Sequence, residues 1–176
     1  MFRSLALNAL YGTTGMGTNY DNMDEMKSFI YKFATDVCSL LNIFKANKVI
    51  IATDAAHAWR KDIDLGTSVG YKGTRNRDNG YNWENIFKCA RDLQSYFNAL
   101  GYHGAHIEHG EADDIAALCK DVVFKRYADY NVIIVSADAD LRQLIDFNPG
   151  TNQYCCVYNT IGKGKGGKRY LYATQA

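Results

Sequence analysis

The chain has 176 residues, of which 47% are hydrophobic and 22% charged, the composition of one globular domain with a sizeable core. It contains no run of about 18 apolar residues, which a membrane-spanning helix needs, and its start lacks the pattern of a secretory signal. The five cysteines are odd in number and form no CxxC pair, so they indicate neither a disulfide framework nor a zinc knuckle. We therefore expect a cytoplasmic protein with reduced thiols and no membrane partner.

Charge is segregated along the chain although the formal net charge is only +1. Residues 147–176 contain no acid, whereas residues 108–114 contain four. Separation of this kind suits a site that holds both metal and phosphate better than a uniformly basic surface. The basic residues of the C-terminal stretch are Lys163, Lys165, Lys168 and Arg169.

Predicted strands and helices alternate along the chain. Apolar residues recur at helical spacing over 26–44 and 82–100, whereas KVIIAT at 48–53 and VIIVS at 132–136 are apolar runs typical of strands buried on both faces. This alternation predicts an α/β fold with a central, mostly parallel sheet. The other predicted elements are strands at 3–8 and 103–107, helices at 111–126 and 139–145, and an edge strand at 154–159.

Residues 55–81 form the one long stretch with weak periodicity. Glycine and threonine interrupt it repeatedly, and it carries several basic residues. We expect a flexible excursion from the domain here. The basic residues are Arg60, Lys61, Lys72, Arg75 and Arg77.

Acidic residues follow three of the predicted strands. They are Asp54, Glu111, Asp113, Asp114, Asp138 and Asp140. The carboxyl ends of parallel strands meet at one edge of a sheet, so we expect these side chains to converge there. Crowded carboxylates raise one another's pKa, and divalent cations are the usual counter-charge. Oxygen ligands favour Mg²⁺ or Mn²⁺, and two such ions about 4 Å apart suit phosphodiester hydrolysis, whereas helix capping is the purely structural alternative.

Three motifs carry a family resemblance. They are TDAAHAWR at 53–60 followed by YKGTR at 71–75, GEADDIAAL at 110–118, and SADADLRQL at 136–144. In order and spacing they resemble the 5′-nuclease family of flap endonucleases, bacteriophage 5′-to-3′ exonucleases and polymerase-associated 5′-nuclease domains. The resemblance implies a PIN-like core with helices on both faces of the sheet, and a flexible arch at about 59–81 for a 5′ single strand. It also implies a phage origin, and hence action in the host cytoplasm.

Carried onto this chain, the resemblance implies a two-metal site. Asp54, Glu111, Asp113 and Asp114 match ligands or outer-shell residues of the first ion, and Asp138 with Asp140 match those of the second. The implied cofactor is Mg²⁺ or Mn²⁺. The reaction is hydrolysis of DNA at 5′ flaps or 5′ ends to give 5′-phosphate and 3′-hydroxyl products.

The resemblance also implies residues that contact DNA. Lys72 and Arg75 match the family's catalytic basic pair, whose charges stabilise the scissile phosphate in the transition state. Tyr71 is suited to stacking on an unpaired base. The full set expected to bind nucleic acid is Tyr71, Lys72, Arg75, Arg60, Lys163 and Lys165.

Two departures from the family pattern stand out. The family's first strand ends in an aspartate, and the register of SLALNALYG places Ala6 at that position, so one metal ligand is altered. The family also continues into a helical duplex-binding region, which residues 1–176 do not include. We therefore expect one catalytic core that works with a missing domain or a C-terminal partner.

Two rival functions remain open from the sequence. Ala6 and the missing region are consistent with a non-catalytic subunit that binds flaps or other nucleic acid. The carboxylates alone are also consistent with a PIN-type ribonuclease acting on RNA, although the YKGTR motif disfavours it. Product analysis separates the three, whereas the salt dependence of binding does not.

Overall fold

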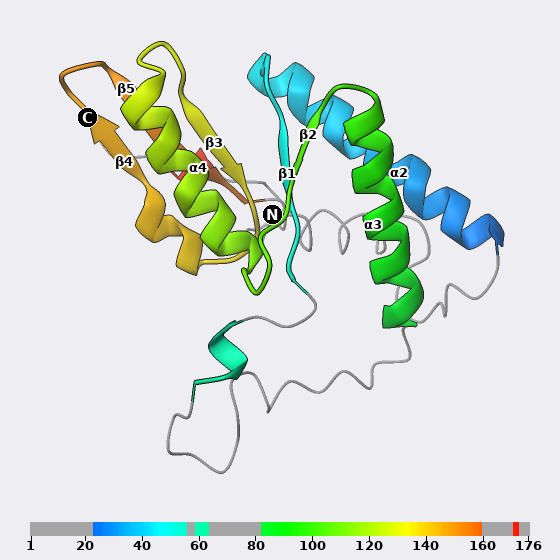
Figure 1. The fold of residues 1–176 in the computed structure, drawn as a ribbon. Coiled ribbons are helices and arrows are strands. Elements are labelled where there is room, and N and C mark those ends of the chain that lie inside the picture. Colours follow the sequence, from blue (N-terminus) through cyan, green and yellow to red (C-terminus); the bar gives the residue numbers. More distant parts are fainter. Residues whose placement is uncertain (1–22, 56–58, 64–81, 160–170, 173–176) are drawn as a thin grey trace, which may run out of the picture.

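The computed structural model describes residues 23–55, 59–63, 82–159 and 171–172 (Figure 1). The helices are α2 (Met23–Phe44), α3 (Trp83–Ala99) and α4 (Ala112–Arg126), with 3-10 helices at Trp59–Lys61 and Asp140–Leu144. The strands are β1 (Ile50–Ala52), β2 (His103–Ala105), β3 (Val132–Val135), β4 (Asp146–Asn148), β5 (Gln153–Tyr158) and β6 (Leu171–Tyr172).

The strands form two sheets in which the predicted parallel pairing is present. β1 pairs in parallel with β2, and β3 pairs in parallel with β5. β4 and β6 pair with β5 in antiparallel fashion and complete the second sheet. Among the described strands no ladder joins β1 to β3, so the expected central sheet consists here of a two-stranded and a four-stranded part.

Helix α2 forms because its apolar residues share one face. Phe29, Phe33, Val37 and Leu40 follow the helical period, and all four are buried. They join Phe97 of α3 in the main core, where the rings of Phe33 and Phe97 meet edge to face with centroids 6.1 Å apart. Burying each phenylalanine stabilises the fold by about 1.5–3 kcal/mol. The same core extends to β1 and β3, so α2 spans both sheets.

Helix α4 covers the opposite face of the sheets. Near its start, Ala112 and Ile115 pack on Ala52 of β1, where small side chains allow a close approach. One turn later, Ala116 packs on Ile134 of β3. Figure 1 shows α4 alongside β3, whereas α2 and α3 lie by β1 and β2. Helices on both faces confirm the predicted architecture, and α4 begins where β1 ends.

An apolar cavity of about 370 Å³ lies between the facing edges of β1 and β3. Its walls include Leu40 of α2, Ile50 of β1, Ile115 of α4 and Ile133 of β3. Helix packing therefore connects the two sheets.

The strand predicted at 3–8 lies outside the described residues.

The strand predicted at 154–159 is present as β5, but its predicted position at the edge of the sheet is wrong. β5 lies between β3 and β4, and its residues Cys155, Cys156 and Val157 are all buried. Such a run is typical of an inner strand, but the polar residues around it concealed the pattern. β4 and β6 were not predicted, because strands of three and two residues are too short to show a period.

Other sequence predictions have clear outcomes. The short helix expected at 139–145 is a 3-10 helix, and the strands at 48–53 and 103–107 are each reduced to three residues. All five cysteines are free thiols, as expected. Within the part of the chain that the structure describes, no helix combines the length and apolarity that crossing a bilayer would require.

Candidate functional site

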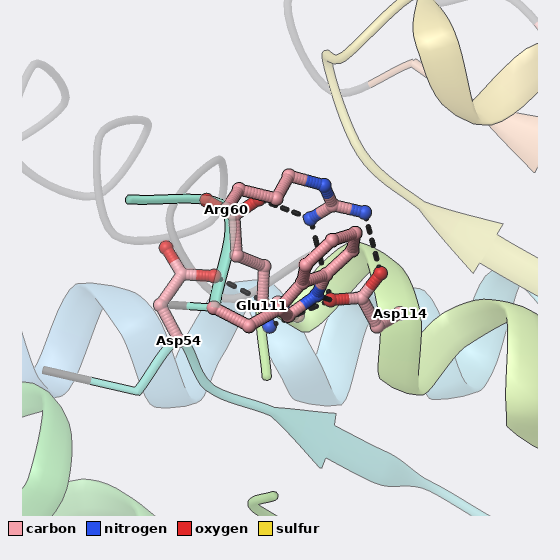
Figure 2. A network of polar contacts seen from close by, with 6 residues as sticks. Asp54, Arg60, Glu111 and Asp114 are labelled. Atoms are coloured by element: carbon pink, nitrogen blue, oxygen red, sulfur yellow. Dashed lines mark hydrogen bonds and ion pairs between the residues drawn. The ribbon is translucent and has the colours of Figure 1, made fainter. Parts of the chain in front are cut away.

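Asp54 connects the end of β1 to the start of α4. It lies two residues beyond the strand, and its Oδ1 accepts a hydrogen bond from the backbone N–H of Ala112 at 2.8 Å (Figure 2). The first N–H groups of a helix have no partner within the helix, so a carboxylate there satisfies a donor and interacts favourably with the helix dipole. The strand-ending acid therefore fixes the N-terminus of α4 at this edge of the sheet.

Asp114 stabilises the same turn from within α4. Its Oδ2 accepts the backbone N–H of Glu111, the N-cap residue, at 2.9 Å. Glu111 itself is buried, with 6% of its surface exposed. The structural alternative of helix capping is thus realised by Asp114.

A guanidinium lies between these two acids. Arg60 donates through Nη2 to Asp114 Oδ1 at 2.6 Å and through Nη1 to Asp114 Oδ2 at 3.3 Å, and Nη1 also pairs with Glu111 Oε2 (Figure 2). The indole Nε1 of Trp59 donates to Asp114 Oδ2 at 3.3 Å. The Arg60 guanidinium carbon lies 4.9 Å from the centre of the Trp59 ring, a cation–π contact. Two residues from the predicted arch thus contact the first turn of α4.

Backbone hydrogen bonds place these two residues. Ala55 N donates to Gly110 O at 2.9 Å, and Trp59 N donates to His109 O at 2.8 Å. His109 has a φ of 61°, in the left-handed region that a residue with a Cβ seldom adopts. The turn before α4 therefore accepts backbone hydrogen bonds from residues on both sides of 56–58.

The electrostatics differ between neighbouring acids. Burial opposes ionisation of Asp114, but the hydrogen bonds from the Glu111 amide, Arg60 and Trp59 outweigh it and lower its pKa. Burial raises the pKa of Asp113, and the negative charges of Asp138, Asp54 and Glu111 raise it further. Asp113 therefore faces a concentration of negative charge, which a bound cation would relieve.

The third acidic pair follows β3. The backbone N–H of Asp138 donates to Ser136 Oγ at 3.1 Å, and that of Asp140 donates to Asp138 Oδ1 at 3.0 Å. These bonds order the turn between β3 and the 3-10 helix, and both carboxylates are exposed. Asp138 is close enough to act on the charge of Asp113. Asp54, Asp113 and Asp138 thus come from separate elements, and the charges of Asp54 and Asp138 both act on Asp113.

Residues 3–166 match the family of 5′-3′ exonuclease N-terminal, resolvase-like domains. The chain belongs to this family. A comparison with curated protein sequences finds no match.

Solved structures of bacteriophage T5 proteins share the fold of this family member. The T5 D15 protein co-crystallised with metal ions is 17% identical, with a TM-score of 0.65 over 96% of this chain and 55% of that one. The T5 D15 flap endonuclease in a complex with DNA and metal ions is 18% identical, with a TM-score of 0.57 over 81% of this chain and 49% of that one. The T5 5′-exonuclease with bound zinc is 19% identical, with a TM-score of 0.57 over 81% and 49%. The chain thus spans about half the length of these proteins.

The acids of this 5′-3′ exonuclease domain offer the oxygen donors that a divalent cation needs. Asp54, Asp113 and Asp138 approach one another from separate elements, and the charge concentrated at Asp113 fits a cation there. Across the described ranges, no three histidine, cysteine, aspartate or glutamate side chains already form a group spaced to hold a metal ion. The donors fit by chemistry, and ligation requires side-chain movement.

Several of the expected site residues lie outside the residues that the structure describes. Of the predicted arch at 59–81, only residues 59–63 are described. The expected residues outside the described ranges are Ala6, Tyr71, Lys72, Arg75, Lys163 and Lys165.

Two contributing residues were not predicted from the sequence. Trp59 was not expected to contact the acids, and Ser136 was not expected to order the turn that carries Asp138. A Ser-x-Asp sequence after a strand is a local turn signal that identifies Ser136. No comparable signal identifies Trp59, because its partner Asp114 lies 55 residues further along the chain.

Proposed function

We propose that this chain is the catalytic core of a divalent-metal-dependent 5′-nuclease that hydrolyses phosphodiesters of branched or 5′-ended DNA. One observation carries the proposal: Asp54, Asp113 and Asp138 gather at one edge of the sheets in a chain of the 5′-3′ exonuclease family. The flap endonuclease of bacteriophage T5, which shares the fold, forms a complex with DNA and metal ions.

The proposed metal-holding residues are Asp54 and Asp113 for one ion, and Asp138 with Asp140 for a second. Hard oxygen donors of this kind suit Mg²⁺ or Mn²⁺. The related T5 proteins contain metal ions, and in one of them the ion is zinc. When bound, such ions lower the pKa of water and stabilise the leaving oxygen of an in-line displacement.

Side chains of the chain would bind and orient the substrate. Lys72 and Arg75 would contact the scissile phosphate and offset the negative charge that grows in the transition state. Tyr71 would stack on an unpaired base, and Lys163 and Lys165 would contact the backbone. We place this action in the cytoplasm, of a host cell if a phage encodes the chain, which agrees with its five free thiols.

Ala6 supports one rival from another class. The family resemblance assigns an aspartate to this position, and alanine has no metal-binding atom. A chain without this ligand would serve as a subunit that binds DNA for a partner. Cleavage and DNA binding by this chain must therefore be measured separately.

The deciding experiment is cleavage of a labelled 5′-flap DNA with Mg²⁺ or Mn²⁺, comparing the chain with its Ala6→Asp variant. We expect the variant to cut faster and to leave 5′-phosphate ends. Lys72→Ala in the variant should reduce cleavage more than DNA binding. If neither protein cuts although both bind the flap, either cleavage needs the family's C-terminal region or the chain is a binding subunit, and cleavage of RNA alone would favour the ribonuclease.

A further inference from the structure

The side-chain amide of Gln94, in α3, contacts the end of β1 that leads to Asp54. We propose that Gln94 is a positioning residue: through Thr53, it fixes the backbone that carries Asp54 and so sets how tightly this edge holds a divalent cation. The inference deepens the proposed metal-dependent function and rests on it. None of the six acids belongs to α3, so this helix would contribute to the site through an amide alone.

The amide of Gln94 bridges the two strands of the first parallel pair. Its Nε2 donates to Ile51 O in β1 at 3.2 Å and to Ala105 O in β2 at 3.4 Å. Both N–H groups of the amide thus face backbone carbonyls, and its Oε1 can only accept. The hydroxyl of Thr53 lies 3.4 Å from Oε1 and donates to it. Three partners therefore set the orientation of this amide.

A glycine in β2 allows α3 to approach this closely. A Cβ added to Gly104 would lie 2.7 Å from Gln94 Cγ and 2.8 Å from Asn98 Oδ1, distances that Cβ atoms do not adopt. Asn98 lies one turn after Gln94 and accepts the backbone N–H of Gly104. The two amides differ in their partners, because Asn98 binds the middle of β2 whereas Gln94 also binds the residue before Asp54.

The two residues that follow β1 are bonded to different helices. Thr53 contacts Gln94 of α3, whereas Asp54 Oδ1 accepts the backbone N–H of Ala112 in α4 at 2.8 Å. Thr53 N donates to Ala105 O at 3.2 Å, and its hydroxyl supplies a second restraint. Adjacent residues share a planar peptide group, so restraints on Thr53 limit rotation of the backbone that carries Asp54. Groups that orient a metal ligand contribute about 10–100-fold to metal affinity or activity.

His106, the residue after β2, reports on the same contact. Its Nδ1 lies 3.4 Å from Thr53 Oγ1. Because the hydroxyl donates its single proton to Gln94, Nδ1 must supply the hydrogen of its own contact, which selects the Nδ1–H form of the neutral imidazole. When the Gln94 oxygen is removed, the hydroxyl can donate to Nδ1 instead, which selects the Nε2–H form. The tautomer of His106 therefore records whether Gln94 holds Thr53.

The first measurement is this tautomer, read from the ¹⁵N chemical shifts of the ring nitrogens at a pH where the imidazole is neutral. It compares the Ala6→Asp parent with Gln94→Met and Asn98→Ala made in the same background. We expect the Nδ1–H form of His106 in the parent and in Asn98→Ala, the matched control, and a shift toward the Nε2–H form in Gln94→Met. Equal tautomer populations in the parent and Gln94→Met would overturn the link through Thr53.

The second measurement is the affinity for Mn²⁺ alone, from electron paramagnetic resonance of the free ion. Thr53→Val removes the hydroxyl at nearly constant shape and should weaken Mn²⁺ binding about tenfold or more. Thr53→Ser keeps the hydroxyl and should restore binding. Gln94→Met should weaken binding at least as much as Thr53→Val, and the double variant no more than Gln94→Met, since both act through one contact. Thr35→Val, which removes a hydroxyl bonded to Tyr31 O within α2, should bind Mn²⁺ as the parent does.

Thermal unfolding separates positioning from support of the fold. Asn98→Ala should unfold at a lower temperature yet bind Mn²⁺ as the parent does, whereas folded Thr53→Val should bind it more weakly. If Thr53→Val binds Mn²⁺ as the parent does, or Thr53→Ser binds it as weakly as Thr53→Val, the inference is wrong. Failure of the proposed function looks different: the parent then binds Mn²⁺ without cutting flap DNA, and the effect of Thr53→Val on Mn²⁺ is still measured. A parent that binds no Mn²⁺ would overturn both.

Discussion

The two ends of α4 are stabilised by different chemistry. At its start, charged groups surround the first turn, with Arg60 on Asp114 and negative charge concentrated at Asp113. Beyond its last turn, the neutral amide of Gln153 donates to the carbonyls of Tyr127 and Tyr130 at 2.8 and 2.9 Å. The contacts at the first end therefore involve charged groups, whereas the contact beyond the last turn joins neutral groups.

This difference separates a site from a structural contact. Gln153 is 1% exposed, and its Oε1 accepts the hydroxyl of Thr151 at 2.9 Å, so its polar atoms are satisfied within the protein. Asp113, by contrast, faces Asp54 and Asp138, which repel it. Burial and these negative charges raise the pKa of Asp113, so this end carries the charge that the proposed cation would offset.

The largest expected effect is at the charged end. Asp138→Asn should reduce Mn²⁺-dependent cleavage by the Ala6→Asp chain more than about 100-fold, since even a residue that only orients a metal ligand contributes about 10–100-fold. Loss of its charge should bring the pKa of Asp113 down and leave the fold as stable as before or slightly more so. Flap cleavage and thermal unfolding measure the two effects. Asp129→Asn, an exposed change beyond the other end of α4, is the control, and equal rates for both variants would contradict the assignment.

The neutral end should show the reverse. Gln153→Met removes the donor of Tyr130 O, whereas Tyr127 O keeps its hydrogen bond from Tyr130 N at 3.1 Å, so it should lower the free energy of unfolding by about 1–3 kcal/mol, the cost of one unsatisfied group. Urea denaturation measures this loss, and Mn²⁺ binding should stay at the parental level. The exposed Gln143→Met provides the comparison. A Gln153→Met protein that is stable but binds no Mn²⁺ would mean that the two ends are coupled.

A smaller effect is expected from Trp59→Phe. The indole donates one hydrogen bond to Asp114 and is 46% exposed, so its loss should cost about 0.5–1 kcal/mol in urea denaturation. Phenylalanine keeps an aromatic face for Arg60. Tyr31→Phe, which removes the hydroxyl of an exposed aromatic residue of α2, should cost less. If both variants lose the same free energy of unfolding, the indole hydrogen bond does not contribute to stability.

The smallest effect concerns the Lys120–Asp146 ion pair, whose atoms are 2.6 Å apart. The hydrogen bond between them raises the pKa of Lys120 above 10.5 and lowers that of Asp146 below 3.8. The pair therefore stabilises the protein between these values and loses its effect as pH falls through the lowered pKa or rises through the raised one. Lys120→Met should cost at most about 1 kcal/mol at pH 7, since Asp146 is half-exposed, and less at pH 2. If the loss of stability is the same at both pH values, it comes from packing of the Lys120 side chain and not from the ion pair.

Local patterns in the sequence predicted most of the architecture. The helical period of α2 and the apolar runs of β1 and β3 identified these elements, and the acids after the strands identified the edge where Asp54 meets α4. The inner position of β5 was missed, because polar neighbours hide its buried run. The contact of Arg60 with Asp114 was missed for another reason: the two residues are 54 positions apart, and no local pattern records such a pairing.

The conformation of His109 limits which sequences can keep this site. Its φ of 61° suits glycine, asparagine or aspartate, whereas valine or isoleucine would clash with the backbone. Its carbonyl accepts the Trp59 amide, so a change of backbone at this residue would also move Arg60. Among randomised chains selected for function, position 109 should therefore admit small or short polar residues and exclude β-branched ones.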